Sequence, residues 1–288
     1  MDPSLQKLPN GDWNYSLSPF FEPPRPILAL TATTTFALLT LSHVTLGLRH
    51  KTKYMIPLII GCILETLGYI YRYMSIQDPF DATKFVVQYV SVIIAPILVT
   101  TSLYTLLEKV MHASHPSVAP FRNASWVFVG VEVVTFFVQV VGAGIASAPD
   151  AGEGVQKVGS WVMVGGIGLQ LGSFCVYLGI AWVFYARARD LEVVGCVAAL
   201  NPHWRKVFNV LVLASGVVLV RSVFRLVEFV IGYDGPIAKN ELYLYGFDFL
   251  LMAISCFCLV LVHPGRILGN GAGTPSTTEL HYFTERAI

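Results

Sequence analysis

Charged residues are scarce in this sequence. Asp, Glu, Lys and Arg make up 13% of the 288 residues and hydrophobic residues 55%, whereas an ordinary soluble domain is about 25% charged. The mean hydropathy is +0.63. This composition excludes a soluble protein with a large core and predicts an integral membrane protein.

A strong charge imbalance is also missing. The net charge is +1, which is too small to attract nucleic acid by general electrostatics, so we expect no nucleic-acid partner. No phosphate-binding P-loop pattern (GxxxxGK[ST]) occurs, which excludes ATP hydrolysis by that route. No early segment combines a basic start, a short apolar run and a cleavage site, so we expect no signal peptide.

Cysteine is rare and odd in number, with five residues in the chain. Cys62, Cys175, Cys256 and Cys258 fall in apolar runs, and Cys196 falls in a loop. No cysteine is in a segment expected outside the cell. We therefore predict no disulfide framework and interpret the cysteines as small apolar core residues.

Seven apolar segments are long enough to cross a membrane as helices, for which about 20 residues are needed. The loops between them are short, so no soluble domain is inserted. The sequence predicts an all-α seven-helix membrane domain at 27–266, between polar tails at 1–26 and 267–288. The predicted spans lie at 27–48, 54–76, 85–107, 126–148, 158–185, 207–232 and 242–263.

Lys and Arg are concentrated on one side of these spans, in the loops after the first, third and fifth and in the C-terminal tail. Basic loops face the cytoplasm, so we predict an outside N-terminus and a cytoplasmic C-terminus. The sequon at Asn14 would then lie outside and is a glycosylation candidate. A second sequon at Asn123 would lie inside and is predicted to be unused.

Seven ionisable residues interrupt the apolar spans, where such groups are costly unless they face protein or water. The charges of the four acidic and three basic residues nearly cancel, as expected if they form ion pairs inside a helix bundle. These residues are Glu65, Arg72, Glu132, Arg221, Arg225, Glu228 and Asp248.

Helical spacing places these residues on polar stripes. We predict that the stripes turn inward and form a substrate- or ion-binding centre, a funnel that opens outward and narrows at Glu65 and Arg221. The alternative is that buried ion pairs only fix helix register, although desolvation makes a purely structural cluster expensive. Besides the charged residues, the stripes contain Tyr69, Gln88, Gln139, Gln170 and Tyr245.

Glu65 and Arg72 lie in the stretch "ETLGYIYR". Seven residues of helix rise about 10 Å, which is too far for a direct ion pair. We therefore predict Arg221 or Arg225 as the partner of Glu65, and Glu228 or Asp248 as the partner of Arg72. Gly68, between them, would leave room for a neighbour or a ligand.

Two further local features concern packing. Gly165, Gly166, Gly168 and Gly172 in the fifth span include a GxxxG pattern, which predicts a close helix–helix contact. Pro96, in the middle of the third span, predicts a kink.

All seven histidines are predicted on the cytoplasmic side. His43 and His263 lie at the inner ends of the first and last spans and could meet. A zinc site needs three or four ligands, so we interpret them as structural and predict no metal and no cofactor.

Ordered motifs over nearly all of 27–266 resemble the fungal RTA-type family, the lipid-translocating exporters. Glu132 stands where that family more often has Asp, which keeps the charge. The matching elements are His43, "ETLGYIYR", Gln88, Ala95–Pro96, Tyr104, "EVVTFFVQVVGAG", "GLQ" at Gly168, "RSVFRLVE", "YGFD" and "HPG" at His263.

The resemblance implies seven helices, an outside N-terminus and a fungal membrane, often the plasma membrane. It also implies handling of amphipathic lipids such as sphingoid long-chain bases, and of toxic or porphyrin-like amphiphiles. We therefore predict a lipid translocator and not an enzyme. A cationic head group would bind near Glu65, Glu228 and Asp248, and an anionic head group would bind near the arginines. Transport would be either facilitated diffusion or coupled to protons, with Glu65 as the proton carrier.

Two alternatives stay open. The first is a seven-helix lipid sensor or receptor, although the Asp/Glu-Arg-Tyr-like triplet, the outer cysteine pair and the Asn-Pro-x-x-Tyr motif of G-protein-coupled receptors are missing. The second is an intramembrane hydrolase, which needs a nucleophile or a metal, and only His43 and His263 begin to offer one.

Overall fold

A computed structural model describes most of the chain. The described residues are 24–115, 124–148, 152–194, 201–232 and 240–268, together with Trp13, Tyr15, Ser18, Phe20 and Gly235. The sequons at Asn14 and Asn123, the loop Cys196 and most of the C-terminal tail lie outside these residues. The predicted division into tails and membrane domain stays a prediction.

Seven helices of the described residues are long and apolar enough to cross a membrane, which confirms the predicted fold class. The last of them is assembled from four helical pieces, one of which is a π-helix. In chain order the elements are α1 (Pro26–His50), η3 (Lys53–Met55), α2 (Ile56–Gln77), α3 (Ala82–Ser114), α4 (Ala124–Ala146), α5 (Glu153–Val194), α6 (Trp204–Ile231), α8 (Glu241–Tyr243), the π-helix η5 (Leu244–Phe249), α9 (Leu250–Leu261) and α10 (Pro264–Leu268).

Helices α3 and α5 are longer than the apolar spans predicted, with 33 and 42 residues. Both continue past their apolar run through sequence rich in Ala, Leu, Glu, Lys and Arg. These residues favour a helix at least as well as the apolar ones do. Hydropathy therefore located the membrane crossing but underestimated the helix.

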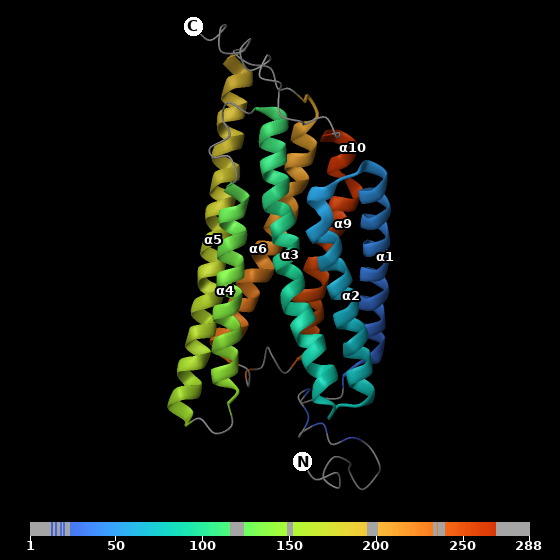
Figure 1. The fold of residues 1–288 in the computed structure, drawn as a ribbon, viewed down its shortest axis with the longest axis vertical. Coiled ribbons are helices and arrows are strands. Elements are labelled where there is room, and N and C mark those ends of the chain that lie inside the picture. Colours follow the sequence, from blue (N-terminus) through green and yellow to red (C-terminus); the bar gives the residue numbers. More distant parts are fainter. Residues whose placement is uncertain are drawn as a thin grey trace.

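The helices form a bundle with two sides (Figure 1). Helices α4 and α5 pack on each other on one side, α1, α2 and α9 lie on the other, and α3 and α6 stand between. We call the end where α1 begins the amino end and the end with α10 the carboxy end. The two ends carry different charges, since most described Lys and Arg outside the spans lie at the carboxy end.

The start of α3 at the amino end is fixed by a side-chain cap. Asp81 Oδ1 accepts hydrogen bonds from the backbone N–H of Thr83 at 2.9 Å and of Lys84 at 3.4 Å. The Lys84 ammonium lies 3.1 Å from Asp81 and 3.0 Å from Asp78. This hydrogen bonding to Lys84 lowers the pKa of the Asp81 carboxyl, and the cap satisfies N–H groups that a helix start leaves without partners.

Glycines allow the closest helix contacts, but not at the predicted GxxxG. A Cβ on Gly142 of α4 would lie 2.6 Å from the backbone N of Met163 in α5, and one on Gly159 would lie 2.5 Å from the backbone N of Ala146. A Cβ on Gly168 or Gly172 would meet nothing within 4 Å. The GxxxG prediction was therefore wrong for Gly168 and Gly172, whose face of α5 points away from α4. Of the four glycines named with it, Gly166 does pack on α4, where a Cβ would lie 2.9 Å from Gln139 Cγ.

Candidate functional site

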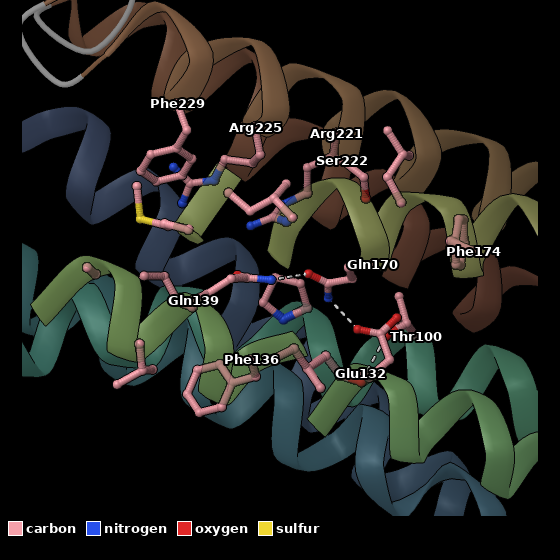
Figure 2. Close-up of a pocket in the computed structure, with 18 of the residues that line it drawn as sticks. Thr100, Glu132, Phe136, Gln139, Gln170, Phe174, Arg221, Ser222, Arg225 and Phe229 are labelled. Carbon is pink, nitrogen blue, oxygen red and sulfur yellow. Dashed lines mark hydrogen bonds between the residues drawn. The ribbon is translucent and has the colours of Figure 1, made fainter. Parts of the chain in front are cut away.

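A cavity of about 390 Å³ lies between α3, α4, α5 and α6. It extends from Tyr89 and Phe229, near the amino end of the bundle, to Thr100 and Phe174 about midway through it. Pro96, the proline inside α3, also lines it. Figure 2 shows the polar side chains of the cavity on two facing walls.

Glu132 of α4 is the acid of one wall, and it is buried. The Tyr104 hydroxyl donates a hydrogen bond to Glu132 Oε1 at 2.6 Å, and the Gln170 amide donates to Oε2. Gln139 donates in turn to Gln170 Oε1 at 2.8 Å. Two helices, α3 and α5, thus supply neutral donors to the carboxylate on α4, and no cationic nitrogen of the described residues lies within salt-bridge distance of it.

Arg221 and Arg225 of α6 form the facing wall (Figure 2). Their guanidinium groups share Asp248: Arg221 Nη2 lies 2.5 Å from Oδ1, and Arg225 Nη2 lies 3.5 Å from Oδ2. Arg225 Nη1 also donates to Glu228 Oε2 at 2.9 Å. Two bases and two acids therefore balance on this wall.

Asp248 and Tyr245 come from the π-helix η5 in the last span, and both are buried. A π-helical turn within an α-helix is uncommon and frequently marks a functional site. Here it lies where the last span contacts the arginines of α6.

Arg72 of α2 belongs to a second ion pair, closer to the amino end. Its Nη2 lies 2.7 Å from Glu241 Oε1, and its Nε donates to the Tyr245 hydroxyl at 2.9 Å. The predicted partners of Arg72, Glu228 and Asp248, were therefore wrong. The long side chain of Arg72 reaches the start of the last span instead of α6.

The prediction for Glu65 was also wrong. Arg221 and Arg225 are both bound to Asp248, and Glu65 forms no ion pair or hydrogen bond among the described residues although only 2% of it is exposed. Gly68, one turn further on, leaves room for a neighbour and not for a ligand, because a Cβ there would lie 2.8 Å from Val92 of α3.

The single predicted polar centre is therefore divided into two parts. Of the predicted site residues, Glu132, Gln139, Gln170, Arg221 and Arg225 line the cavity. The second part, which we call the ion network, shares the two arginines of α6 with the cavity and comprises the Arg72 contacts and the Asp248 contacts. Its members are Arg72, Arg221, Arg225, Glu228, Glu241, Tyr245 and Asp248.

Glu65, Tyr69 and Gln88 are buried outside the cavity. Tyr69 packs among aromatic rings, with its ring centroid 5.8 Å from that of Phe36, and its hydroxyl has no hydrogen-bond partner among the described residues. Gln88 Oε1 likewise lacks one. The deep end of the cavity is thus at Thr100 and Phe174, and the predicted narrowing at Glu65 was wrong.

Helical spacing missed two residues that hold the site. Tyr104 binds Glu132, and its role was indicated only by the family motif that contains it. Glu241 binds Arg72, but it follows a polar loop and its charge there is unremarkable. The sequence around each of them does not indicate its role, because each binds a residue of another helix.

Aromatic rings lie between the cavity and the carboxy end of the bundle. The ring centroids of Tyr104 and Tyr177 are 4.8 Å apart, and those of Phe174 and Tyr177 are 5.4 Å apart. Further on, Phe184, Trp204 and Phe208 pack together.

The side of the cavity between α3 and α4 has a different character. Val90, Phe137 and Val140 line it while being 43%, 61% and 50% exposed. Their apolar side chains also belong to the outer surface of the bundle, which in a membrane faces lipid. The cavity is thus bounded by lipid-facing side chains laterally and by packed rings toward the carboxy end.

The histidines of the first and last spans make ordinary structural contacts. His43 Nε2 lies 3.1 Å from the carbonyl oxygen of Cys256, and His263 Nδ1 accepts a hydrogen bond from Gly265 N at 3.2 Å. In the part of the chain that the structure describes, no group of three or more His, Cys, Asp or Glu is arranged to hold a metal ion.

Comparison with known proteins identifies the family. The family model described as "RTA1 like protein" matches residues 58–271, which include the cavity and the ion network. The chain belongs to this family. This confirms the resemblance that the sequence motifs indicated. No solved structure matches the chain.

Three relatives from Saccharomyces cerevisiae illustrate the range of the family. Protein RTM1 is 31% identical over 229 residues, covering 78% of this chain and 71% of the relative. Protoporphyrin uptake protein 1 is 29% identical, covering 75% of this chain and 69% of the relative. Sphingoid long-chain base transporter RSB1 is 27% identical, covering 86% of this chain and 74% of the relative.

Proposed function

We propose that this protein moves amphipathic lipids across its membrane, with the head group in the cavity and the tail in the surrounding lipid. The observation that carries the proposal is a buried carboxylate, Glu132, in a cavity whose rim is apolar and exposed. An amphiphile has the same division between a polar head and an apolar tail. The names of two relatives, a sphingoid long-chain base transporter and a protoporphyrin uptake protein, support the same activity.

The charges favour a cationic head group over an anionic one. Arg221 and Arg225 are neutralised by Asp248 and Glu228, and Arg72 is neutralised by Glu241. Glu132, the acid that lines the cavity, is left without a cation among the described residues. An ammonium group beside Glu132 would supply the missing charge, which makes sphingoid long-chain bases the preferred substrate class.

The cavity is large enough for such a head group. Its volume of about 390 Å³ is within the range of small-molecule sites, which is about 300–1,000 Å³. It therefore accommodates an amino-alcohol head group and the first part of the chain. The rest of a long alkyl chain would leave through the apolar rim at Phe137.

The orientation and location follow from the distribution of basic residues. We propose that the carboxy end, with residues such as Arg49, Lys109 and Arg205, faces the cytoplasm and that the amino end faces outward. The cavity would then be reached from the outer side of the membrane. The plasma membrane is the proposed location, and no enzymatic step is assigned to the protein.

Flux of labelled phytosphingosine into proteoliposomes tests the proposal. We expect flux above that of empty liposomes, and a fall to that level for Glu132→Gln. Glu153→Gln is the matched control, because it removes a carboxylate that is exposed at the amino end. Equal flux in empty, wild-type and Glu132→Gln liposomes would refute transport, and Glu132-dependent binding without flux would favour a lipid sensor.

A further inference from the structure

Glu65 is the ionisable residue of the membrane interior that the proposed transport site leaves unexplained. It is 2% exposed and does not line the cavity. No donor or cationic nitrogen of the described residues is within bonding distance of its carboxyl group. A buried carboxylate with neither is highly unfavourable, because nothing replaces the hydration that it loses.

Glu132 differs from Glu65 in this respect. Tyr104 and Gln170 donate to its two oxygens, and such hydrogen bonds stabilise the charged form. Two buried acids of the same type thus differ in their hydrogen bonding, and only Glu65 lacks donors that would stabilise its charged form. The neutral acid is the form of Glu65 that its surroundings accommodate.

The groups that interact electrostatically with Glu65 come from four elements. They are Cys62 and Tyr69 of α2, Arg221 and Arg225 of α6, Asp248 of η5 and Cys256 of α9. With Glu65 neutral, Arg221, Arg225, Asp248 and Glu228 add up to zero charge. With Glu65 ionised, the same group carries one negative charge in excess.

Arg221 connects Glu65 with the cavity. It lines the cavity, it is paired with Asp248, and its Nε has no hydrogen-bond partner among the described residues. A cation that enters the cavity repels Arg221 and Arg225 across it. An ionised Glu65, which lies outside the cavity lining, offers Arg221 a second negative partner besides Asp248, so cation binding favours ionisation of Glu65.

We propose that Glu65 is a proton-binding site that releases its proton when a cationic head group occupies the cavity, so that one proton is exchanged for one amine. The O–H bond of the carboxyl group breaks, its electron pair stays on the carboxylate oxygen and the proton goes to water. Nothing is oxidised or reduced. The inference rests on the proposed function for its substrate, but the proton on Glu65 does not depend on it.

Infrared difference spectroscopy tests the proton directly and without substrate. A protonated carboxyl group has a carbonyl band that a carboxylate lacks. We expect the spectrum of the wild-type protein near neutral pH to contain a band that Glu65→Gln removes and Glu228→Gln retains. No difference between wild type and Glu65→Gln in this region would overturn the proposal.

Binding of phytosphingosine to the purified protein in weakly buffered solution tests the exchange. We expect the wild type to release about one proton per amine bound, so that affinity rises up to about tenfold per pH unit where Glu65 is protonated. Glu65→Gln should bind without releasing a proton, and Glu132→Gln should not bind. The uncharged N-acylated analogue should release no proton from the wild type.

The outcomes separate this inference from the proposed function. Proton release that persists in Glu65→Gln would overturn the exchange while leaving amine transport intact. A wild type that binds no amine would refute both the exchange and the proposed substrate, whereas the infrared band would still decide whether Glu65 holds a proton. The histidines are unchanged in Glu65→Gln, so protons that they bind or release cannot account for a difference between the two proteins.

Discussion

The Tyr104 hydroxyl donates a hydrogen bond of 2.6 Å to the Glu132 carboxylate, and both residues are almost fully buried. The bond joins α3 to α4 at the deep end of the cavity. It belongs to the packing of the bundle and to the proposed substrate site at the same time. A change at Tyr104 should therefore affect stability and binding together.

Tyr104→Phe should lower stability by about 1.5–3 kcal/mol, because a hydrogen bond to a charged group is lost and the carboxylate stays buried. Tyr177→Phe is the matched control. The Tyr177 hydroxyl donates to the Leu103 carbonyl at 3.2 Å, and losing such a neutral bond costs about 0.5–1.5 kcal/mol. Thermal unfolding in detergent compares them. Adding Glu132→Gln should make Tyr104→Phe less costly, and a purely additive result would contradict the pairing.

Gly142→Ala should destabilise the contact between α4 and α5 by about 1–3 kcal/mol, the usual cost of an added group in a packed interior. The new methyl group would lie 2.6 Å from the backbone nitrogen of Met163 and 2.8 Å from the carbonyl oxygen of Gly159, and neither helix backbone can yield easily. Gly168→Ala, in open space, should be neutral or stabilising, since Ala favours a helix by about 1 kcal/mol over Gly. Unfolding in denaturing detergent distinguishes them. A larger loss for Gly168→Ala would reverse the assignment of the packing face.

Hydropathy and length predicted the seven spans because both are local properties of a segment. The presence of Glu132 and Arg221 in an apolar run likewise indicated inward faces, because the bilayer penalises any other direction. The partners were a different matter. Arg72 and Glu241 are 169 positions apart, and which acid an arginine reaches depends on how α2 and the last span pack. Long-range packing of that kind has no signature in either segment alone.

Glu241→Gln should lower the free energy of unfolding by about 3 kcal/mol. This is the lower end of the range for breaking a buried ion pair, because 18% of the Glu241 side chain and 9% of the Arg72 side chain are exposed. Arg72 would keep its charge and lose its only acidic partner among the described residues. Asp78→Asn is the control. It removes one exposed acidic partner of Lys84 and leaves the other, Asp81, so it should lower the free energy of unfolding by at most about 1 kcal/mol. Chemical denaturation of both variants gives the comparison. Equal losses would show that the Arg72–Glu241 pair behaves as a surface pair.

The last prediction concerns the closed carboxy end. Glu192 of α5 binds three residues there: His115 Nε2 at 3.1 Å, Trp204 Nε1 at 3.0 Å, and Arg205. These contacts tie the end of α5 to the end of α3 and the start of α6. If a substrate is to leave through this end, the three helices must separate. Glu192 is therefore placed to hold the closed arrangement.

Glu192→Ala should expose the rings beneath the cavity to solvent from the carboxy end. Ser215→Cys is a suitable reporter, because Ser215 is fully buried and its hydroxyl lies 3.4 Å from that of Tyr177. We expect a membrane-impermeant thiol reagent supplied at the carboxy end to modify Cys at this position several times faster when Glu192→Ala is added. Asp190→Ala, which removes an exposed acid of the same helix end, should leave the rate unchanged. Unchanged modification in both would mean that Glu192 stabilises the helix ends without controlling access to the cavity, because the aromatic rings alone would then keep this end closed.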